Sequence, residues 1–153
     1  MKNLITIIAF GFLLMIAGGS GRRGGTPEGS PVDFQVILSG TYSNASTFNV
    51  ELVTSENEWG RVWRTAKGRE EPLPERPSVN FGSSYVIAAF MGQRNSSGYK
   101  IEIDKIEKKG RTLLVHVKKY ETPGMLTVMT QPFTLVRIPK GRYNLEVIEE
   151  SVQ

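Results

Sequence analysis

The chain has 153 residues, of which 39% are hydrophobic and 22% are charged, a balance typical of a single globular domain. It contains no cysteine, which excludes disulfides, thiolate nucleophiles and cysteine-ligated metals. One histidine, His116, leaves little material for acid–base catalysis or a metal site, and we expect no catalytic residue, metal or cofactor. The net charge of +4 comes without the strip of basic and aromatic residues that would predict a nucleic-acid partner. Composition therefore favours a binding or structural protein over an enzyme.

Residues 1–19 are predicted to be a signal peptide. Lys2 supplies a positive charge, residues 4–17 are an apolar run, and Ala17 precedes small residues that suit a signal peptidase. The run is shorter than the ~20 residues that a bilayer-spanning helix needs, although an uncleaved anchor helix stays open as the alternative. The segment is similar to a bacterial lipoprotein signal, except that Gly19 stands where the lipid-bearing cysteine would be. We expect an extracytoplasmic protein, located in the periplasm or cell envelope or secreted.

Residues 20–31 are predicted to be a glycine-rich linker that precedes a domain over residues 32–149. The linker has no large hydrophobic side chain, so it cannot bury apolar surface and should act as a flexible tether. Arg22 and Arg23 are available to anionic headgroups, so a peripheral or tethered membrane contact stays open.

The domain is expected to begin with two strands, over residues 34–39 and 47–53. The second alternates between apolar and polar side chains, and the polar segment 40–46 between them has turn-forming residues. We predict that the two strands form a hairpin.

One amphipathic helix is expected to follow. Ser55 and Glu58 have the spacing of a capping box, and Gly68 is expected to end the helix in a left-handed conformation. The apolar residues lie at the spacing of one helix face: Trp59, Val62, Trp63 and Ala66. The two tryptophans are therefore interpreted as core residues that pack the helix on a sheet, in preference to a ligand platform.

Residues 85–91 are apolar at every position, which predicts a central strand covered on both faces. Further strands are expected over residues 133–138 and 143–148. With the hairpin described next, the sum is an α+β domain in which one helix packs on a mostly antiparallel sheet of about seven strands, with a sandwich as an open variant.

The clearest hairpin joins residues 99–107 to residues 112–120. Pairing Ile103 with Val115 matches the apolar faces and leaves a three-residue loop that ends at the flexible Gly110. In that register His116 lies opposite Glu102, which we interpret as an ordinary cross-strand pair on a solvated face. The surplus of lysines along this hairpin is interpreted in the same way.

Two loops are candidates for partner recognition. Residues 92–98 are polar and turn-forming and are held between two strands, and residues 123–133 combine a Pro-Gly step with methionines and a Gln-Pro-Phe step. Methionines and an aromatic next to proline suit protein recognition, with core packing as the alternative.

The order of these features resembles the PrcB-type family, the C-terminal domain of protease-complex subunits. The closest match covers residues 85–139, and Ser97 stands where such domains often have a glycine. The residues that carry the resemblance are Tyr85 to Phe90, Met91-Gly92-Gln93-Arg94, Ser97-Gly98-Tyr99, Ile101-x-Ile103, Pro123-Gly124, Thr130-Gln131-Pro132-Phe133 and Val136-Arg137-Ile138-Pro139.

The resemblance implies a non-catalytic, extracytoplasmic protein that associates with a secreted protease and helps to mature or stabilise it. We predict that Tyr99 and Phe133 anchor the contact and that Gly98 sets the turn. The full predicted contact surface is Asn95, Ser96, Ser97, Gly98, Tyr99, Gln131, Pro132 and Phe133.

A weaker similarity links residues 95–99 and 131–133 to the two loops with which chagasin-type inhibitors enter a protease cleft, although Ser96 stands where that motif has proline. Direct protease inhibition is therefore one alternative function. A structural or ligand-binding module of the cell envelope is another. The partner's identity and the oligomeric state stay open.

Overall fold

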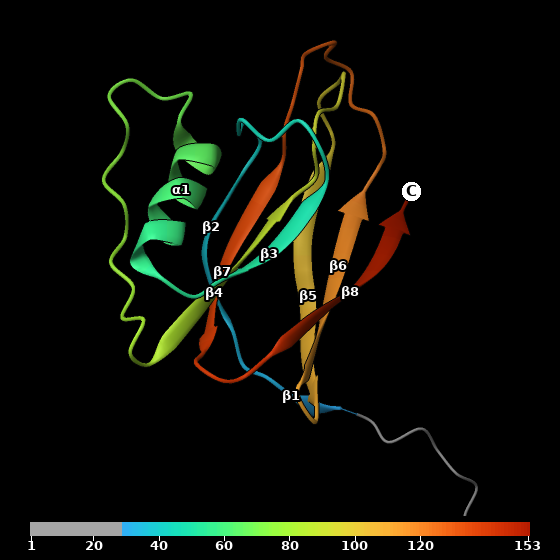
Figure 1. The fold of residues 1–153 in the computed structure, drawn as a ribbon. Coiled ribbons are helices and arrows are strands. Elements are labelled where there is room, and N and C mark those ends of the chain that lie inside the picture. The colour runs from blue at the N-terminus through green and yellow to red at the C-terminus, as the bar shows by residue number, and fades with distance from the viewer. Residues whose placement is uncertain (1–28) are drawn as a thin grey trace, which may run out of the picture.

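Two four-stranded β-sheets and one helix make up the part of the chain that the structure, a computed structural model, describes, residues 29–153 (Figure 1). The predicted signal peptide and all but the end of the predicted linker lie outside these residues. In residues 29–153, no helix is long and apolar enough to cross a bilayer. The elements are β1 (Ser30–Pro31), β2 (Gln35–Gly40), β3 (Asn49–Val53), α1 (Glu56–Lys67), β4 (Ser84–Phe90), β5 (Lys100–Lys109), β6 (Thr112–Tyr120), β7 (Phe133–Pro139) and β8 (Asn144–Val152).

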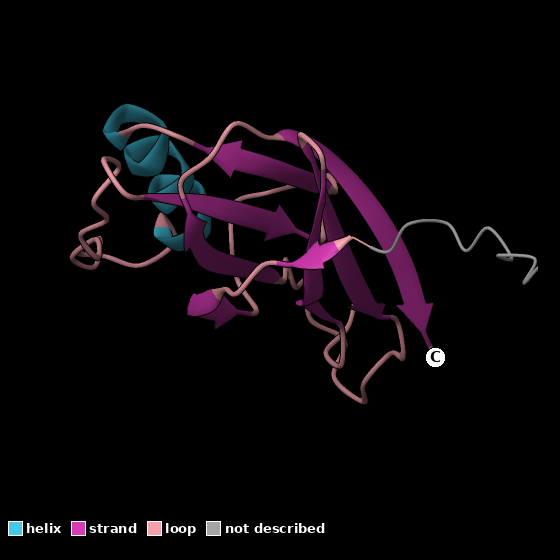
Figure 2. Cartoon of the chain, turned by 90° about the horizontal axis from the view of Figure 1, so that it is seen from below, coloured by secondary structure: helices cyan, strands magenta, loops and turns pink. Residues whose placement is uncertain are grey.

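The two sheets form a sandwich with α1 outside one of them (Figure 2). Sheet A has the strand order β1-β5-β6-β8, and sheet B has the order β2-β7-β4-β3. Every pair is antiparallel except β6 with β8. The predicted α+β class and the mostly antiparallel pairing are confirmed, in the sandwich variant. β1 lies within the range predicted as linker, where Pro31 pairs with Glu107 of β5.

The helix forms where the sequence predicts it. The Ser55 side chain accepts a hydrogen bond from the Glu58 backbone N–H. In turn, the Glu58 carboxylate accepts hydrogen bonds from the backbone N–H groups of Thr54 and Ser55. These bonds satisfy donors that the first helical turn leaves free. They also lower the pKa of Glu58, chiefly through the Thr54 backbone N–H.

Both helix tryptophans are core residues, as predicted. Trp59 and Trp63 are buried, and their indole N–H groups donate to the carbonyl oxygens of Pro77 and Pro74, each at 2.9 Å. The carbonyl oxygens of the proline-rich segment therefore accept hydrogen bonds from the two indole N–H groups, which burial would otherwise leave unsatisfied.

The apolar β4 strand is central and covered on both faces, which confirms that prediction. Val86, Ala88 and Phe90 belong to the core cluster beneath α1. Ile87 and Ala89 belong to the second cluster, between the two sheets. This alternation explains why every position from Val86 to Phe90 is apolar.

The predicted hairpin between the strands over residues 34–39 and 47–53, which are β2 and β3, is wrong. β2 pairs with β7 and β3 pairs with β4, so the two strands occupy opposite edges of sheet B. β4 and β7 are apolar on both faces, and they take the interior positions where neighbours on both sides shield them. The less buried strands are left at the edges.

The predicted register of the β5–β6 hairpin is also wrong. Ile103 pairs with Val117, and a bulge between Ile103 and Lys105 shifts the phase so that Ile106 also faces the core. The turn has two residues, and Gly110 is left-handed with φ +59° as predicted.

The shifted register moves the single histidine. His116 lies opposite Lys105, and its Nε2 is 2.8 Å from a carboxylate oxygen of Glu107, not beside Glu102. Lys105 and then His116 hold the pKa of Glu107 below its ordinary value.

Gly68 differs from the prediction in its conformation. Its φ of −67° is not left-handed. A Cβ at this position would lie 2.3 Å from the Arg64 carbonyl oxygen and 2.8 Å from Asn44 Nδ2, so glycine is required by close approach.

Candidate protein-binding surface

Two loops far apart in the sequence lie side by side at one end of the sandwich. The first loop, residues 91–99, joins β4 to β5, and the second, residues 121–132, joins β6 to β7. Arg94 and Thr130 exchange two backbone hydrogen bonds, of 2.8 and 2.9 Å, like residues of paired strands. These bonds satisfy backbone groups that a free loop would leave to water.

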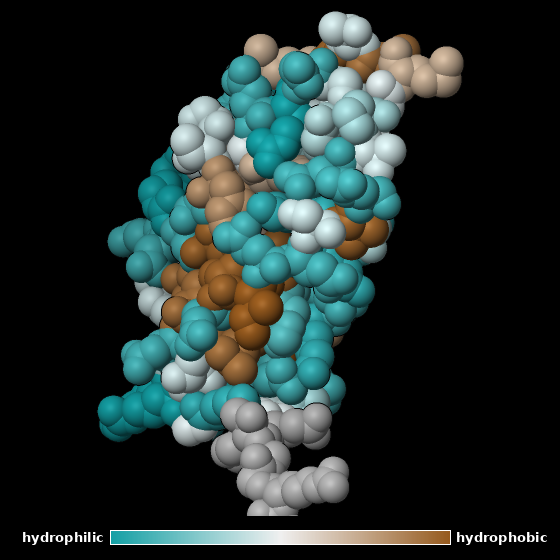
Figure 3. All heavy atoms as spheres, turned by 90° about the vertical axis from the view of Figure 1, so that its right-hand side faces the viewer, coloured by the Kyte–Doolittle hydropathy of each residue, from teal (hydrophilic) through white to brown (hydrophobic). Residues whose placement is uncertain are grey.

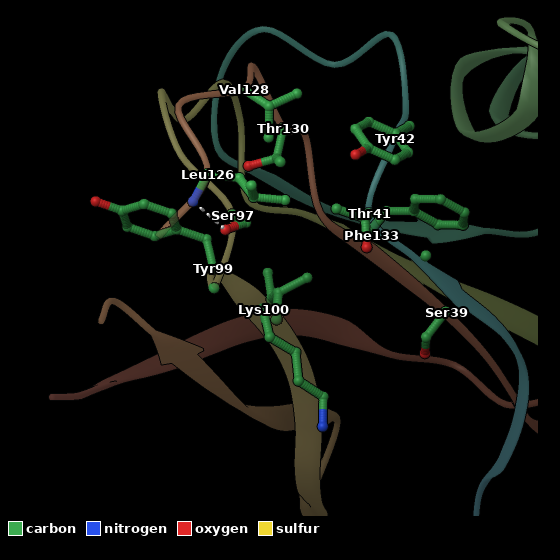
Figure 4. Close-up of a pocket in the computed structure, with 13 residues that line it drawn as sticks. Ser39, Thr41, Tyr42, Ser97, Tyr99, Lys100, Leu126, Val128, Thr130 and Phe133 are labelled. Carbon is green, nitrogen blue, oxygen red and sulfur yellow. Dashed lines mark hydrogen bonds between the residues drawn. The ribbon is translucent and has the colours of Figure 1, made fainter. Parts of the chain in front are cut away.

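A second group of contacts joins the loop tips. The Ser97 N–H donates to the Leu126 carbonyl at 2.9 Å, and the Leu126 N–H donates to the Ser97 hydroxyl at 3.2 Å (Figure 4). The Gly124 N–H donates to the Ser97 carbonyl. The first loop therefore holds the second in a fixed position.

Two glycines permit this close approach. Gly98 has φ +91°, and a Cβ there would lie 2.5 Å from both the Gly124 nitrogen and the Thr122 oxygen. A Cβ on Gly124 would lie 2.2 Å from the Ser97 hydroxyl. The Gly-Tyr and Pro-Gly steps thus have a structural role, since they let the two loops touch.

Tyr99 lies against its own loop. The Arg94 guanidinium is 5.7 Å from the centre of the Tyr99 ring and forms an ion pair with Glu121 at 3.7 Å. The tyrosine is half-buried, and Figure 4 shows its ring directed away from Phe133 and Ser39. The Tyr99 ring is therefore only partly accessible to a partner, and it also packs against Arg94 of its own loop.

The exposed apolar residues of this end define an apolar lip. Leu126 is 67% exposed, and Tyr42, from the loop after β2, is 50% exposed. Met125, which is fully exposed, and Met129, which is half-exposed, come from the same loop as Leu126. We name these four exposed residues the apolar lip: Tyr42, Met125, Leu126 and Met129. Grouped exposed apolar side chains are typical of an interaction surface.

A groove of about 580 Å³ lies beneath the lip, between the two sheets (Figure 4). One wall is residues 39–42 of β2 and the following loop, and the other is residues 97–101 at the start of β5. Side chains from the second loop and the core complete it: Leu126, Val128, Thr130 and Phe133. Most of its surface is apolar, with a few hydroxyl groups.

The structure divides the predicted contact residues into two groups. Asn95 is exposed, and Ser96 to Tyr99 form the loop junction described above. Gln131, Pro132 and Phe133 are buried, so a partner would reach Phe133 only through the groove that it lines. Phe133 begins β7 and lies between Gly40 and Phe90 in the sheet, so its ring belongs to the core and forms part of the groove lining.

Sequence reasoning missed the second wall of the groove. Ser39, Thr41 and Tyr42 come from a segment about 60 residues before the first loop, and no local pattern places the two together. Met125, Leu126 and Met129 are exposed, so the core-packing alternative does not hold for these three residues.

The charges beside the groove are paired. Lys100 contacts Glu102, whose other oxygen accepts a bond of 2.9 Å from the Tyr120 hydroxyl. Lys100 and then Tyr120 lower the pKa of Glu102, while the Glu102 acceptor raises the pKa of Tyr120. In residues 29–153, no three His, Asp or Glu side chains are grouped to hold a metal ion.

The comparisons with known proteins agree with this layout. The family model described as PrcB C-terminal matches residues 85–139, so this part of the chain is similar to PrcB C-terminal domains. The match runs from β4 to β7 and contains both joined loops, whereas β2, with the facing wall of the groove, lies outside it. Comparisons with curated proteins and with solved structures gave no match.

Proposed function

We propose that this protein is a non-catalytic, extracytoplasmic binding domain that associates with a secreted protease and helps to stabilise or mature the protease complex. The observation that carries the proposal is the apolar lip on two loops held together by hydrogen bonds. The match of residues 85–139 to the PrcB C-terminal family model supports the choice of partner.

The lip has the properties of a protein-binding surface. Methionine side chains are flexible and polarisable and adapt to a partner's shape, and Leu126 and Tyr42 offer larger apolar area. The backbone beneath them is fixed by the Ser97–Leu126 contacts, so little backbone conformational freedom remains to be lost on binding. An apolar patch on a fixed frame favours a specific partner.

Export is supported by residues 1–19, which have the pattern of a signal peptide. The mass of the protein recovered from an exporting host tests this part. Loss of residues 1–19 from an extracytoplasmic fraction agrees with it, and an intact chain in the cytoplasm contradicts it.

The binding test uses the full chain, expressed in its exporting host with an affinity tag after Gln153. We expect co-purification of one extracytoplasmic protease, and loss of that protease when Leu126→Asp places a charge on the lip. Leu73→Asp is the matched control, because Leu73 is also exposed, at 43%, but lies in the proline-rich segment beside α1. Equal capture by both variants would contradict the lip as the contact surface.

The alternative functions give different results in the same experiment. Recovery of wall polymer without a protease would favour the envelope module. Direct inhibition by two inserted loops loses support, because Pro132 and Phe133 are buried and residues 95–99 are bonded to a neighbouring loop. Co-purified protease that keeps full activity agrees with a stabilising subunit, and we expect no nucleic acid in the eluate.

A further inference from the structure

Two unpaired strand edges line the groove. β5 pairs with β6 on one side and with β1 on the other, but β1 covers only Glu107 and Lys108. β2 pairs with β7 alone among the described strands. Two consecutive residues of each strand line the groove, Ser39 and Gly40 of β2 and Lys100 and Ile101 of β5, and the adjoining loops continue the walls. Consecutive residues of a strand meet at its edge, because their side chains point to opposite faces.

Other parts of these edges are blocked against pairing. On β5, β1 occupies one end, and the bulge between Ile103 and Lys105 interrupts the middle. β2 has its own register shift between Val36 and Leu38. Bulges prevent further strands from pairing with an edge, so these irregularities protect the lower part of the sandwich.

The regular, unblocked part of β5 lies at the groove. It is Lys100–Ile103, four residues spanning about 13 Å of extended chain. Two of them, Lys100 and Ile101, line the groove directly. An unpaired edge presents backbone N–H and C=O groups whose natural complement is another extended backbone.

We propose that an extended segment of the partner protein adds to sheet A as a strand along Lys100–Ile103, in line with β1 on the same edge of β5. This inference rests on the proposed function and specifies how the partner binds. β1 shows that this edge accepts a short strand from elsewhere, since Ser30 and Pro31 pair there and the Val32 N–H donates to Ile106 O at 2.9 Å.

The groove also defines the sequence that this segment must have. Alternate side chains of an added strand point to opposite faces, so one set enters the groove toward Leu126, Val128 and Phe133 and the other faces solvent. The segment therefore has apolar residues at every second position and lacks proline at the residues that face β5, because their N–H groups form the ladder.

The apolar surface on the β8 side carries no comparable inference. Figure 3 shows an apolar area on this side, and partly buried residues of β3 and β8 pack over the same core cluster: Val50, Leu52, Leu145 and Val147. β8 carries Glu146, Glu149 and Glu150, which would repel a second copy paired edge to edge. Nothing in the described residues indicates what would cover it.

The first experiment locates the segment in the intact complex. A benzophenone amino acid replaces Thr41 on the exposed wall of the groove in the tagged full chain, and a second chain carries it at Ser151 in β8 as the control. We expect position 41, and not position 151, to cross-link to one short stretch of the captured protease, identified by mass spectrometry.

The second experiment tests backbone pairing itself. The cross-linked stretch is made as a synthetic peptide in two forms, N-methylated at alternate residues in one register or the other. Only one register removes the N–H groups that face β5, so we expect that form to bind about tenfold or more weakly while the other binds like the unmodified peptide. Equal affinities of the two forms would overturn strand addition.

Filling the groove separates this inference from the proposed function. We expect Thr41→Trp to abolish peptide binding and weaken protease capture about tenfold, and Ser151→Trp to leave both unchanged. If protease capture is lost with Leu126→Asp but persists with Thr41→Trp, strand addition is overturned and the proposed function stands.

If position 41 cross-links to a segment of a protein that is not a protease, and the peptide of that segment binds in a register-dependent way, strand addition is supported and the protease is overturned as the partner. Failure of both capture and cross-linking overturns both.

Discussion

Two segments of this protein combine prolines with large apolar side chains, and the fold uses them in opposite ways. In the first, residues 56–77, the helix tryptophans are buried beneath a proline-rich segment. In the second, residues 121–132, Met125 and Leu126 point into solvent. Similar composition gives a core layer in one case and a displayed surface in the other.

The difference lies in what each segment has beneath it. α1 covers the open face of sheet B, so its apolar stripe has a surface to pack against. The second segment extends beyond the ends of the strands, where its neighbour is another loop that provides backbone hydrogen bonds but no apolar layer. Composition alone therefore does not distinguish a core element from a binding surface.

The largest effect should come from the buried segment. Trp59→Ala should destabilise the protein by about 3–5 kcal/mol, because it leaves a large cavity beneath α1 and frees the Pro77 carbonyl. The urea midpoint measures this loss. A loss below about 1 kcal/mol would contradict the helix layer as a tightly packed core.

The junction of the two loops should give the next effect. Gly98→Ala should cost about 1–3 kcal/mol, because it strains a backbone with φ +91° and drives a Cβ against Gly124. Gly110→Ala is the matched control, since it has φ +59° but open space around the new Cβ, and it should cost about 1 kcal/mol. If the two variants are equally stable and capture the partner equally, close approach of the loops has no role.

The capping box gives a smaller effect that depends on pH. Glu58→Gln should cost about 1 kcal/mol at neutral pH, because the carboxylate accepts bonds from the Thr54 and Ser55 N–H groups. Folding lowers the pKa of Glu58 from its ordinary 4.5, so this stabilisation is present above pH 4.5 and is lost as pH falls through the folded-state pKa. Urea titrations from pH 7 to 3 should show the two proteins converging. A constant difference would contradict the charged cap.

The smallest effect on stability should accompany the largest effect on binding. Replacing Met125 and Leu126 together by serine should change stability by less than about 0.5 kcal/mol, because neither side chain is buried. Capture of the partner by the full chain should nevertheless be lost. A large loss of stability would indicate that the lip packs against the domain.

The sequence predicted the helix and strands more accurately than it predicted which strands pair with one another. The capped helix, its buried stripe, the central strand and the left-handed Gly110 follow from local spacing, and all are confirmed. The false hairpin of β2 and β3 arose because adjacency in sequence was taken for pairing in space. The register error of β5 had a visible sign, since the apolar spacing changes from two to three between Ile103 and Ile106.

The candidate site was predicted only in part. The loop over residues 95–99 and the methionines were chosen as contact candidates from composition. The burial of Phe133 was left open, because it depends on β2 and β4 on either side. The groove could not be predicted, because its walls come from strands in different sheets.

The sequence by itself determined the fold class of this protein, its helix, most of its strands and the similarity of residues 85–139 to PrcB C-terminal domains. These follow from periodicity, capping and turn residues, which act over a few positions. Only the tertiary structure decided which apolar side chains are buried and which strand edges stay open. Burial and edge pairing depend on contacts between distant segments, such as Ser97 with Leu126 and β2 across from β5, and no short-range pattern encodes them.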